Sequence, residues 1–247
     1  MQKHVIHIGT SGWSYRQWLG TFYPKGTTAK NQFPYYLQHF NTVEINNTFY
    51  GLPAKETFLK WKNEVPDDFV YVIKANRNIT HIKKLHDPAE TMALFLEHAA
   101  VLGQKLGTIL FQLPPGLEAD KELLEAFLEE LPTTYRYVFE FRNADWYQPD
   151  IYRLLQKYNC AFCIYELGDH LSPIEVTTDF VYVRLHGPGI KYQGNYSEEV
   201  LQQWAGLCKK WLETKDVFVY FDNTAKEGYA PFNALRLAEL VGVGGRR

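Results

Sequence analysis

The amino-acid sequence predicts an eight-stranded β/α barrel of the TIM type, formed by a single domain over residues 1–247. Three observations lead to this α/β fold class: the length of the chain, the alternation of strand-like with helix-like segments, and the count of eight strand-like runs. A chain of 247 residues has the usual size of one such barrel. Hydrophobic residues make up 46% of it, enough for a large core, and no Gly-, Ser- or Pro-rich linker divides it.

Eight short runs rich in Val, Ile, Phe and Tyr are typical of β-strands. In chain order these runs are His4–Gly9, Thr42–Asn46, Phe69–Asn76, Thr108–Leu113, Tyr137–Arg142, Ala161–Glu166, Phe180–His186 and Val217–Asn223. Helix-like segments separate most of them, and this order predicts a parallel sheet with right-handed crossovers. Eight units favour closure into a barrel, because an open doubly wound sheet usually has fewer strands and a Gly-rich first turn.

Two helix starts carry capping signals. Asp87 can cap a helix, Pro88 suits the first helical position, and Glu90 stands where a capping box needs an acid. Ser197 can cap a second helix, and the two glutamates that follow it place negative charge at the positive end of the helix dipole. We therefore expect helices to begin at both places.

Two further segments, Asp120–Leu131 and Pro149–Tyr158, are amphipathic with helical periodicity. The segment Leu167–Asp179 differs, because it contains Gly168 and Pro173 and few periodic apolar residues. We expect the sixth helix of the barrel to be missing there or replaced by a loop.

Charge and cysteine content limit the partners and the compartment. The formal net charge of −2 indicates no polyanion or membrane partner, although a local basic patch for nucleic acid would be hidden in the total. The N-terminus has no long apolar region typical of a signal peptide, and no run approaches the roughly 20 apolar residues of a membrane span. Three cysteines, an odd and low count, suit a reducing compartment. We expect a cytoplasmic protein that is a monomer or a weak oligomer.

Polar side chains recur on one face of the strands, near their C-terminal ends. Side chains of a barrel strand alternate between the interior and the helix layer. In the run Phe180–His186, Val181 and Val183 must face the helices, so Arg184 and His186 point inward. The same alternation directs inward six further polar residues, which are Glu44, Asn46, Lys74, Gln112, Glu140 and Arg142. In the last strand, apolar residues of both parities leave the facing of Asp222 and Asn223 ambiguous.

These inward residues predict a polar pocket, since barrel enzymes carry their sites at that end and barrel interiors are otherwise apolar. The predicted catalytic residues, which would act as general acids and bases, are Glu44, Lys74, Glu140 and His186. The predicted substrate-binding residues, whose arginines would hold an anion, are Trp13, Asn46, Gln112, Arg142, Trp146, Arg184, Tyr192, Asp222 and Asn223. A purely structural ion-pair network among the charged members is the alternative, because buried charges must be paired.

The same residues carry a resemblance to a known family. The matching segments are Gly9–Tyr15, Val43–Tyr50, Lys74 with Thr80 and His81, Phe111–Pro115, Phe139–Arg142 with Trp146, Tyr182–Gly187, Tyr192 with Tyr196 and Ser197, and Tyr220–Asn223 with Asn233 and Ala234. By these motifs, which cover almost the whole chain, the protein resembles the YecE-like family, also called domain of unknown function 72. The resemblance implies a β/α barrel and names no reaction. Asp222 departs from the family pattern, in which we expect Asn, and adds a negative charge.

Two metal-like patterns are weak. Cys160 and Cys163 are spaced as C-x-x-C, but an offset of three along a strand places their side chains on opposite faces. A second candidate set of metal ligands comprises Glu44, Glu140, Asp222 and His186. Cations expected close to these residues would repel a metal ion. We expect no metal, no cofactor and no disulfide.

Two functions remain open at this stage. The first is an enzyme that acts on a small polar or anionic molecule by general acid–base chemistry, as a hydrolase, lyase or isomerase, without a redox cofactor. The second is a binding module that uses the same pocket for a nucleotide, an RNA or a protein tail. Perturbed pKa values in the pocket favour the enzyme, and a basic stripe on the surface favours nucleic acid.

Overall fold

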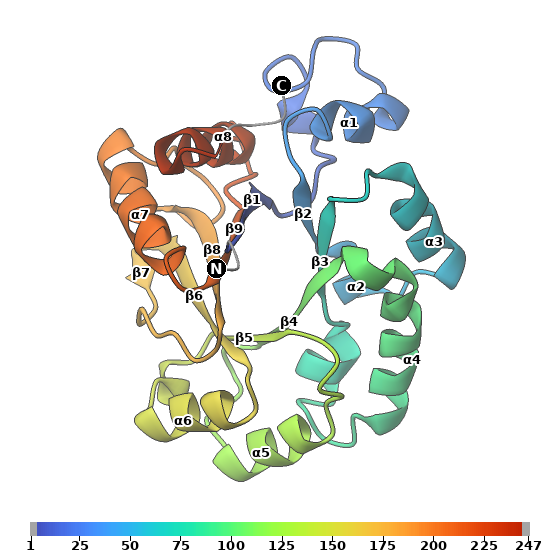
Figure 1. The fold of residues 1–247 in the computed structure, drawn as a ribbon, viewed down its shortest axis with the longest axis vertical. Coiled ribbons are helices and arrows are strands. Elements are labelled where there is room, and N and C mark those ends of the chain that lie inside the picture. Colours follow the sequence, from blue (N-terminus) through green and yellow to red (C-terminus); the bar gives the residue numbers. More distant parts are fainter. Residues whose placement is uncertain (1–3, 244–247) are drawn as a thin grey trace. The chain divides into compact units, whose positions relative to one another are not determined.

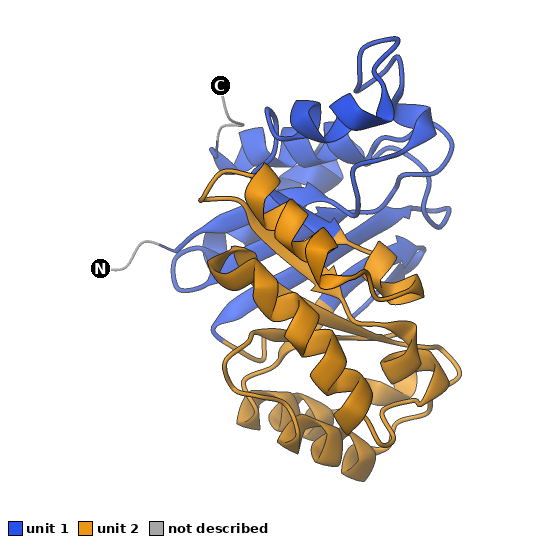
Figure 2. Ribbon diagram, turned by 90° about the vertical axis from the view of Figure 1, so that its right-hand side faces the viewer, with its two compact units in different colours: residues 1–44, 164–172, 179–247 blue, residues 45–163, 173–178 orange. Residues whose placement is uncertain are grey.

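The computed structural model describes residues 4–243. Contacts within the chain divide it into two compact units (Figure 2). Unit 1 comprises the described parts of Met1–Glu44, Ile164–Ser172 and Asp179–Arg247. Unit 2 comprises Ile45–Cys163 and Pro173–Thr178. Each unit is described by itself below.

Among residues 4–243, nine strands form the sheet. They are β1 (Ile6–Thr10), β2 (Thr42–Ile45), β3 (Val70–Lys74), β4 (Leu106–Leu113), β5 (Tyr137–Phe141), β6 (Ala161–Gly168), β7 (His170–Leu171), β8 (Phe180–Pro188) and β9 (Asp216–Phe221). The strand order is β1-β9-β8-β6-β5-β4-β3-β2, with β7 paired to β6 alone. A parallel bridge from Ser11 to Glu44 also links the end of β1 to β2. Parallel strands in this order, alternating with helices, confirm the predicted TIM-type barrel class, and each of the eight predicted strands overlaps an observed one.

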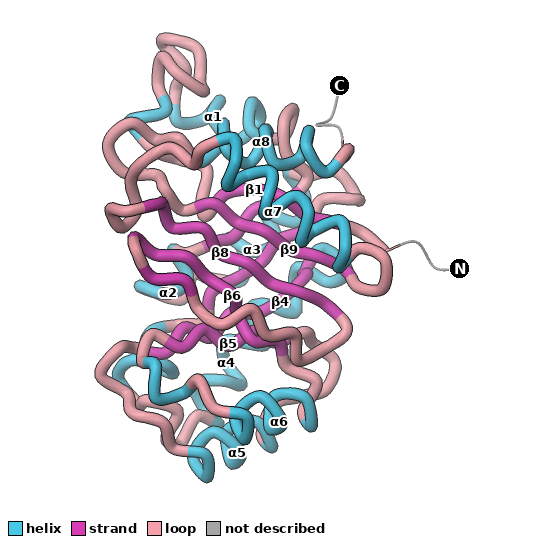
Figure 3. The backbone as a smooth tube through the Cα atoms, turned by 90° about the vertical axis from the view of Figure 1, so that its left-hand side faces the viewer, coloured by secondary structure: helices cyan, strands magenta, loops and turns pink. Residues whose placement is uncertain are grey.

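Helices lie between the strands. They are α1 (Ala29–Tyr36), α2 (Asn47–Tyr50), α3 (Lys55–Glu64), α4 (Ala89–Ala99), α5 (Lys121–Glu129), α6 (Pro149–Lys157), α7 (Glu198–Trp211) and α8 (Ala230–Val241). In unit 1, α7 and α8 pack side by side, and α8 covers β1 and β9 (Figures 1 and 3). In unit 2, α5 packs against α6, and α3 against α4 (Figure 1). Each helix within residues 4–243 is too short or too polar to span a bilayer.

The predicted helix starts had different outcomes. Ser197 caps α7 by accepting a hydrogen bond from the backbone N–H of Val200, as predicted. The capping box at α4 was wrong. Asp87 has a positive φ of 42°, outside the extended conformation of a cap, and α4 begins after Pro88 without any side-chain cap. A turn that leaves residues 84, 85 and 87 at positive φ overrides the local cap signal.

The missing sixth helix is confirmed. Residues 169–179 contain β7 and a loop, in place of a helix. Hydroxyl groups of this segment satisfy backbone donors of β6. Ser172 Oγ accepts from the backbone N–H of Tyr165 at 2.9 Å, and Thr177 Oγ1 accepts from that of Phe162 at 2.8 Å. Side-chain hydroxyl groups of the loop that replaces the helix thus satisfy backbone N–H groups of β6.

The predicted alternation of β8 is also observed. Val181, Val183 and Leu185 are buried on one face of the strand, within unit 1. Tyr182 and Arg184 lie on the other face, where both contact the same carboxylate. Because a β-strand repeats every two residues, the polar face could be read from the sequence of β8 alone.

Candidate functional site

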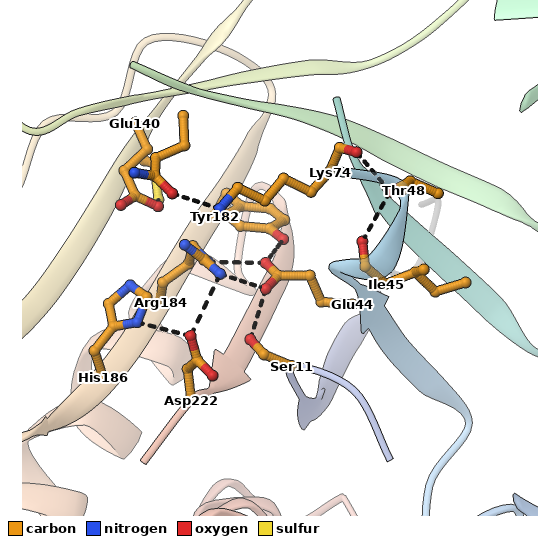
Figure 4. A network of polar contacts seen from close by, with 12 residues as sticks. Ser11, Glu44, Ile45, Thr48, Lys74, Glu140, Tyr182, Arg184, His186 and Asp222 are labelled. Atoms are coloured by element: carbon orange, nitrogen blue, oxygen red, sulfur yellow. Dashed lines mark hydrogen bonds and ion pairs between the residues drawn. The ribbon is translucent and has the colours of Figure 1, made fainter. Parts of the chain in front are cut away.

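A buried ion pair lies at the centre of the polar residues of unit 1 (Figure 4). Glu44 comes from β2 and Arg184 from β8. Arg184 Nη2 donates to Glu44 Oε1 at 2.6 Å, and Arg184 Nε donates to Oε2 at 2.9 Å. The two side chains are 0% and 1% exposed. This bidentate geometry is the strongest pairing of a guanidinium with a carboxylate.

Two hydroxyl groups also contact Glu44 (Figure 4). Ser11 Oγ donates to Oε1 and Tyr182 Oη donates to Oε2, both at 2.6 Å. Burial disfavours ionisation of Glu44, but the Arg184 guanidinium and these hydrogen bonds outweigh it, so the pKa of the carboxyl lies below its usual range. Glu44 is therefore a carboxylate that already accepts four hydrogen bonds.

Each hydroxyl donor can be removed singly. We expect Tyr182→Phe and Ser11→Ala each to lower the free energy of unfolding by about 1–3 kcal/mol, because one oxygen of the buried Glu44 carboxylate loses a hydrogen-bond donor. Urea denaturation of the two variants measures this loss. Thr21→Ala is the control, since its hydroxyl bonds at the surface, and we expect it to stay within about 0.5 kcal/mol of the parent. Parent-like stability of both test variants would contradict the assigned contacts.

A histidine–carboxylate pair lies next to the ion pair in unit 1 (Figure 4). His186 Nδ1 and Asp222 Oδ2 are 3.1 Å apart, and Arg184 Nη2 lies 3.7 Å from the same oxygen. The imidazole is 1% exposed and the Asp222 side chain 14%. These contacts direct Asp222, the residue after β9, toward His186 and Arg184, a facing that the sequence left ambiguous.

The loop after β8 is tightly curled around His186. Tyr192 donates its backbone N–H to the carbonyl of His186, and its ring lies 5.4 Å from the imidazole. The backbone N–H of Gly187 donates to Tyr196 Oη at 3.0 Å. Burial and the charge of Asp222 raise the pKa of Tyr15 far above its usual value, so a neutral phenol also lies near this carboxylate. Of these residues, Tyr192 was a predicted site residue, and the structure places it beside His186.

Asn223 ties three segments of unit 1 together. Its Nδ2 donates to the carbonyl of Gly194 and to Asn233 Oδ1, each at 2.8 Å. Asn233 in turn donates to Asn195 Oδ1 at 2.7 Å. These contacts fit a residue that fixes the loop after β8 to α8, although substrate binding was predicted for it.

Four predicted residues of unit 2 form a second group. Lys74 Nζ donates to Gln112 Oε1, and Gln112 is the register partner of Glu140 across β4 and β5. Arg142 Nε donates to Glu140 Oε1. Glu140 is fully buried, and the Arg142 side chain is 8% exposed. The structure therefore brings together four side chains of unit 2 that were predicted to share the inward face of their strands, namely Lys74, Gln112, Glu140 and Arg142.

Phe49 and His81 join this group of unit 2 and were not among the predicted site residues. Lys74 Nζ lies 4.2 Å from the centre of the Phe49 ring, and the His81 ring lies 4.8 Å from the same centre at 83°. Burial and the charges of Lys74, Arg77 and Arg142 lower the pKa of His81 to about 4. The sequence offered a signal for His81, which belongs with Lys74 and Thr80 to one of the segments that match the family.

Three other predicted substrate-binding residues have different surroundings. Trp146 is completely buried, donates its indole N–H to the carbonyl of Leu117 at 2.8 Å and stacks on Phe141. Its ring therefore offers no exposed face to a ligand. Trp13 is half-buried and packs 4.4 Å from Phe33. Asn46, also half-buried, precedes α2 without a side-chain cap.

The cysteine side chains point to different partners within unit 2. Cys160 Sγ lies 3.5 Å from the carbonyl of Tyr158, whereas Cys163 Sγ lies 3.8 Å from Glu140 Oε2. Burial raises the pKa of the Cys160 and Cys208 thiols to about 12, which makes them poor nucleophiles. Within residues 4–243 no three His, Cys, Asp or Glu side chains are grouped as metal ligands.

Comparison with known proteins decides the family. The family model described as "Protein of unknown function DUF72" matches residues 7–247. The chain belongs to the DUF72 family. The resemblance seen in the sequence motifs is thereby confirmed, and the residues of both polar groups lie within the matched region.

Relatives of this DUF72 protein occur in several bacteria. The UPF0759 protein YunF of Bacillus subtilis is 26% identical over 97% of this chain and 95% of its own length. The UPF0759 protein YecE of Escherichia coli is 32% identical over 58% of this chain and 50% of its own length. The crystal structure of a DUF72 family protein from Thermotoga maritima is 29% identical, has a TM-score of 0.87, and aligns over 97% of this chain and all of its own.

Proposed function

We propose that this DUF72 protein is an enzyme that acts on a small polar molecule by general acid–base chemistry, with His186 as the group that transfers the proton. The observation that carries the proposal is the pair of His186 Nδ1 with Asp222 Oδ2 at 3.1 Å, at the C-terminal ends of β8 and β9. Barrel enzymes place their reacting groups at this end of the strands. Hydrolysis, elimination and isomerisation are the reaction classes that such a group serves without a redox cofactor.

The geometry of the pair suits a general base. A carboxylate that accepts from Nδ1–H fixes the ring orientation and the tautomer, which directs proton transfer to Nε2. The same carboxylate stabilises the imidazolium that forms when His186 takes up a proton. Arg184 Nη2 lies 3.7 Å from the same Asp222 oxygen and helps to hold the carboxylate in place.

Glu44 and Arg184 act differently in this proposal. A carboxylate with four donors and a lowered pKa is poorly suited to accept a proton, so Glu44 positions Arg184. Arg184 lies within 4 Å of two carboxylates, those of Glu44 and Asp222. The ligand expected at this group of unit 1 is a small polar molecule that reaches His186.

The test is a search for turnover in a mixture of cellular metabolites, followed by mass spectrometry. We expect the wild-type protein to consume one polar compound, and His186→Gln to do so on the order of 10²–10⁴ times more slowly, because general acid–base catalysis contributes that much. The product distinguishes the classes: hydrolysis adds one water, elimination splits the substrate, and isomerisation leaves the mass unchanged. His86→Gln, an exposed histidine, is the control and should keep full activity.

The contrary outcome is equally defined. If a compound stays bound to the wild type through gel filtration and none is consumed by the wild type or either variant, the proposed enzyme function is wrong. The protein is then a binding module. Equal rates for wild type and His186→Gln would remove His186 from the chemistry.

A further inference from the structure

We propose that the substrate of this DUF72 protein is a carbohydrate, and that Tyr192 is the platform on which its sugar ring stacks. The inference rests on the proposed function, since it names the class of molecule on which His186 would act. It uses side chains of unit 1 alone, and Tyr192 follows β8 in the loop that curls around His186.

The exposure of Tyr192 is the first argument. Tyr192 is 40% exposed, although the centre of its ring lies only 5.4 Å from that of the buried His186 imidazole, at an interplanar angle of 82°. A second tyrosine, Tyr165, lies 6.3 Å from the same imidazole at 78° but is 2% exposed. Of these two rings, Tyr192 is the one that a ligand can reach from solvent.

The backbone of Tyr192 is the second argument. Its φ of 63° is a left-handed conformation that bulky L-residues rarely adopt. Two hydrogen bonds hold this conformation: the backbone N–H donates to the carbonyl of His186, and the carbonyl accepts from the backbone N–H of Ala225 at 2.9 Å. Strained backbone that carries an exposed ring adds little to stability, and strain of this kind is concentrated at functional sites. The conformation instead fixes the ring beside His186.

The chemistry next to the ring is the third argument. Asp222 Oδ2 lies 3.1 Å from His186 Nδ1, and the Asp222 side chain is 14% exposed (Figure 4). A carboxylate accepts hydrogen bonds without donating any, and an imidazole can do either. An aromatic face, by contrast, binds an apolar surface. A ligand that suits these three groups has an apolar face and carries hydroxyl groups around its rim.

A sugar ring combines these two properties. The C–H groups of a pyranose form an apolar face, and each of its hydroxyl groups can donate to a carboxylate or to an imidazole. A nucleobase also stacks on tyrosine, but its edge mixes acceptors with donors, and a carboxylate can pair only with the donors. Removing a proton from a sugar hydroxyl group, or from a water that attacks the sugar, is work for a general base. Carbohydrate is therefore the ligand class that fits Tyr192, Asp222 and His186 together.

Titration with methyl glycosides, followed by saturation-transfer NMR, tests the site. The panel comprises the methyl pyranosides of glucose, galactose, mannose, xylose and N-acetylglucosamine. We expect at least one of them to bind the wild type through its ring C–H protons. Tyr192→Phe keeps the aromatic ring and should bind this glycoside like wild type. Tyr192→Asn should bind it about tenfold more weakly, because stacking on an aromatic ring contributes roughly that factor.

Thermal denaturation distinguishes a binding role of Tyr192 from a structural one. Asparagine tolerates a positive φ better than tyrosine does, so Tyr192→Asn should melt at or above the wild-type temperature while it loses binding. A melting temperature well below that of wild type would show that the ring is structural and contradict the proposal. Phe232→Ala is the matched control, because Phe232 is 41% exposed on α8 of the same unit, and it should bind the glycoside like wild type.

Three outcomes of the titration would overturn the proposal. The first is that no glycoside of the panel binds the wild type up to about 50 mM, an affinity too weak for a built site. The second is glycoside binding that Tyr192→Asn leaves unchanged, which places the sugar elsewhere. The third is binding of adenosine or cytidine without binding of any glycoside, which would make a nucleobase the stacked ring.

His186→Gln separates this inference from the proposed function. This variant should bind the glycoside like wild type, because the ring of Tyr192 is retained. Glycoside binding by both proteins without turnover of any compound by the wild type would contradict the acid–base role of His186 and leave the sugar site standing. Turnover of an acyclic compound at equal rates by wild type and Tyr192→Asn would contradict the carbohydrate and leave the role of His186 standing.

Discussion

Replacing Arg184 with alanine will lower the free energy of unfolding by about 3–5 kcal/mol, the largest effect that we expect from any single change in the polar groups. The variant removes the bidentate guanidinium partner of the fully buried Glu44 carboxylate, which keeps its two neutral hydroxyl donors. Urea denaturation measures the loss. Arg236→Ala is the control, since this arginine also binds two carboxylates but is 43% exposed, and exposed pairs contribute about 0–1 kcal/mol.

The pH dependence of the same variant gives an independent check. In the wild type the pKa of Glu44 is lower in the folded than in the unfolded state, so its contribution to stability is complete above about pH 4.3 and is lost as pH falls through the folded-state pKa. Without Arg184, burial raises the pKa of Glu44 instead, and acid then relieves the penalty. We expect the stability difference between the two proteins to shrink toward pH 3. A difference that stays constant from pH 7 to about pH 3 would contradict the ion pair as its source.

Replacing Gly187 with alanine will lower the free energy of unfolding by about 2–4 kcal/mol, from backbone strain and a steric clash together. Gly187 has a φ of 102°, and a Cβ atom there would lie 2.1 Å from the carbonyl oxygen of Gln193. Because that oxygen belongs to the backbone, the whole loop beside His186 must move. Thermal and urea denaturation measure the loss of stability.

Gly189 provides a matched control in the same loop. Its φ is 69°, but a Cβ atom there would meet nothing within 4 Å. Gly189→Ala should therefore cost only the conformational strain, about 1 kcal/mol. Equal effects at the two positions would show that the close approach of Gln193 to Gly187 is unimportant for the loop.

Local patterns in the sequence determined much of the secondary structure of this protein. The strand runs, the absence of the sixth helix and the polar face of β8 follow from periodicity and turn residues, which act over a few positions along the chain. The cap of α7 by Ser197 is likewise a contact within four residues. The spaced motifs indicated the family, which the match over residues 7–247 confirmed.

Only the tertiary structure decided which of these polar residues pair. Glu44 and Arg184 are 140 residues apart, and alternation along each strand gives the facing of a side chain but never its partner. Partners depend on the register between strands, as for Gln112 and Glu140, and on long-range packing, as for the burial of Trp146. Packing likewise brought His81 to Phe49, whereas the turn at residues 84–87 holds Asp87 out of its capping conformation. Burial and pairing are properties of the assembled fold, so the pKa values that follow from them could not be read from the sequence.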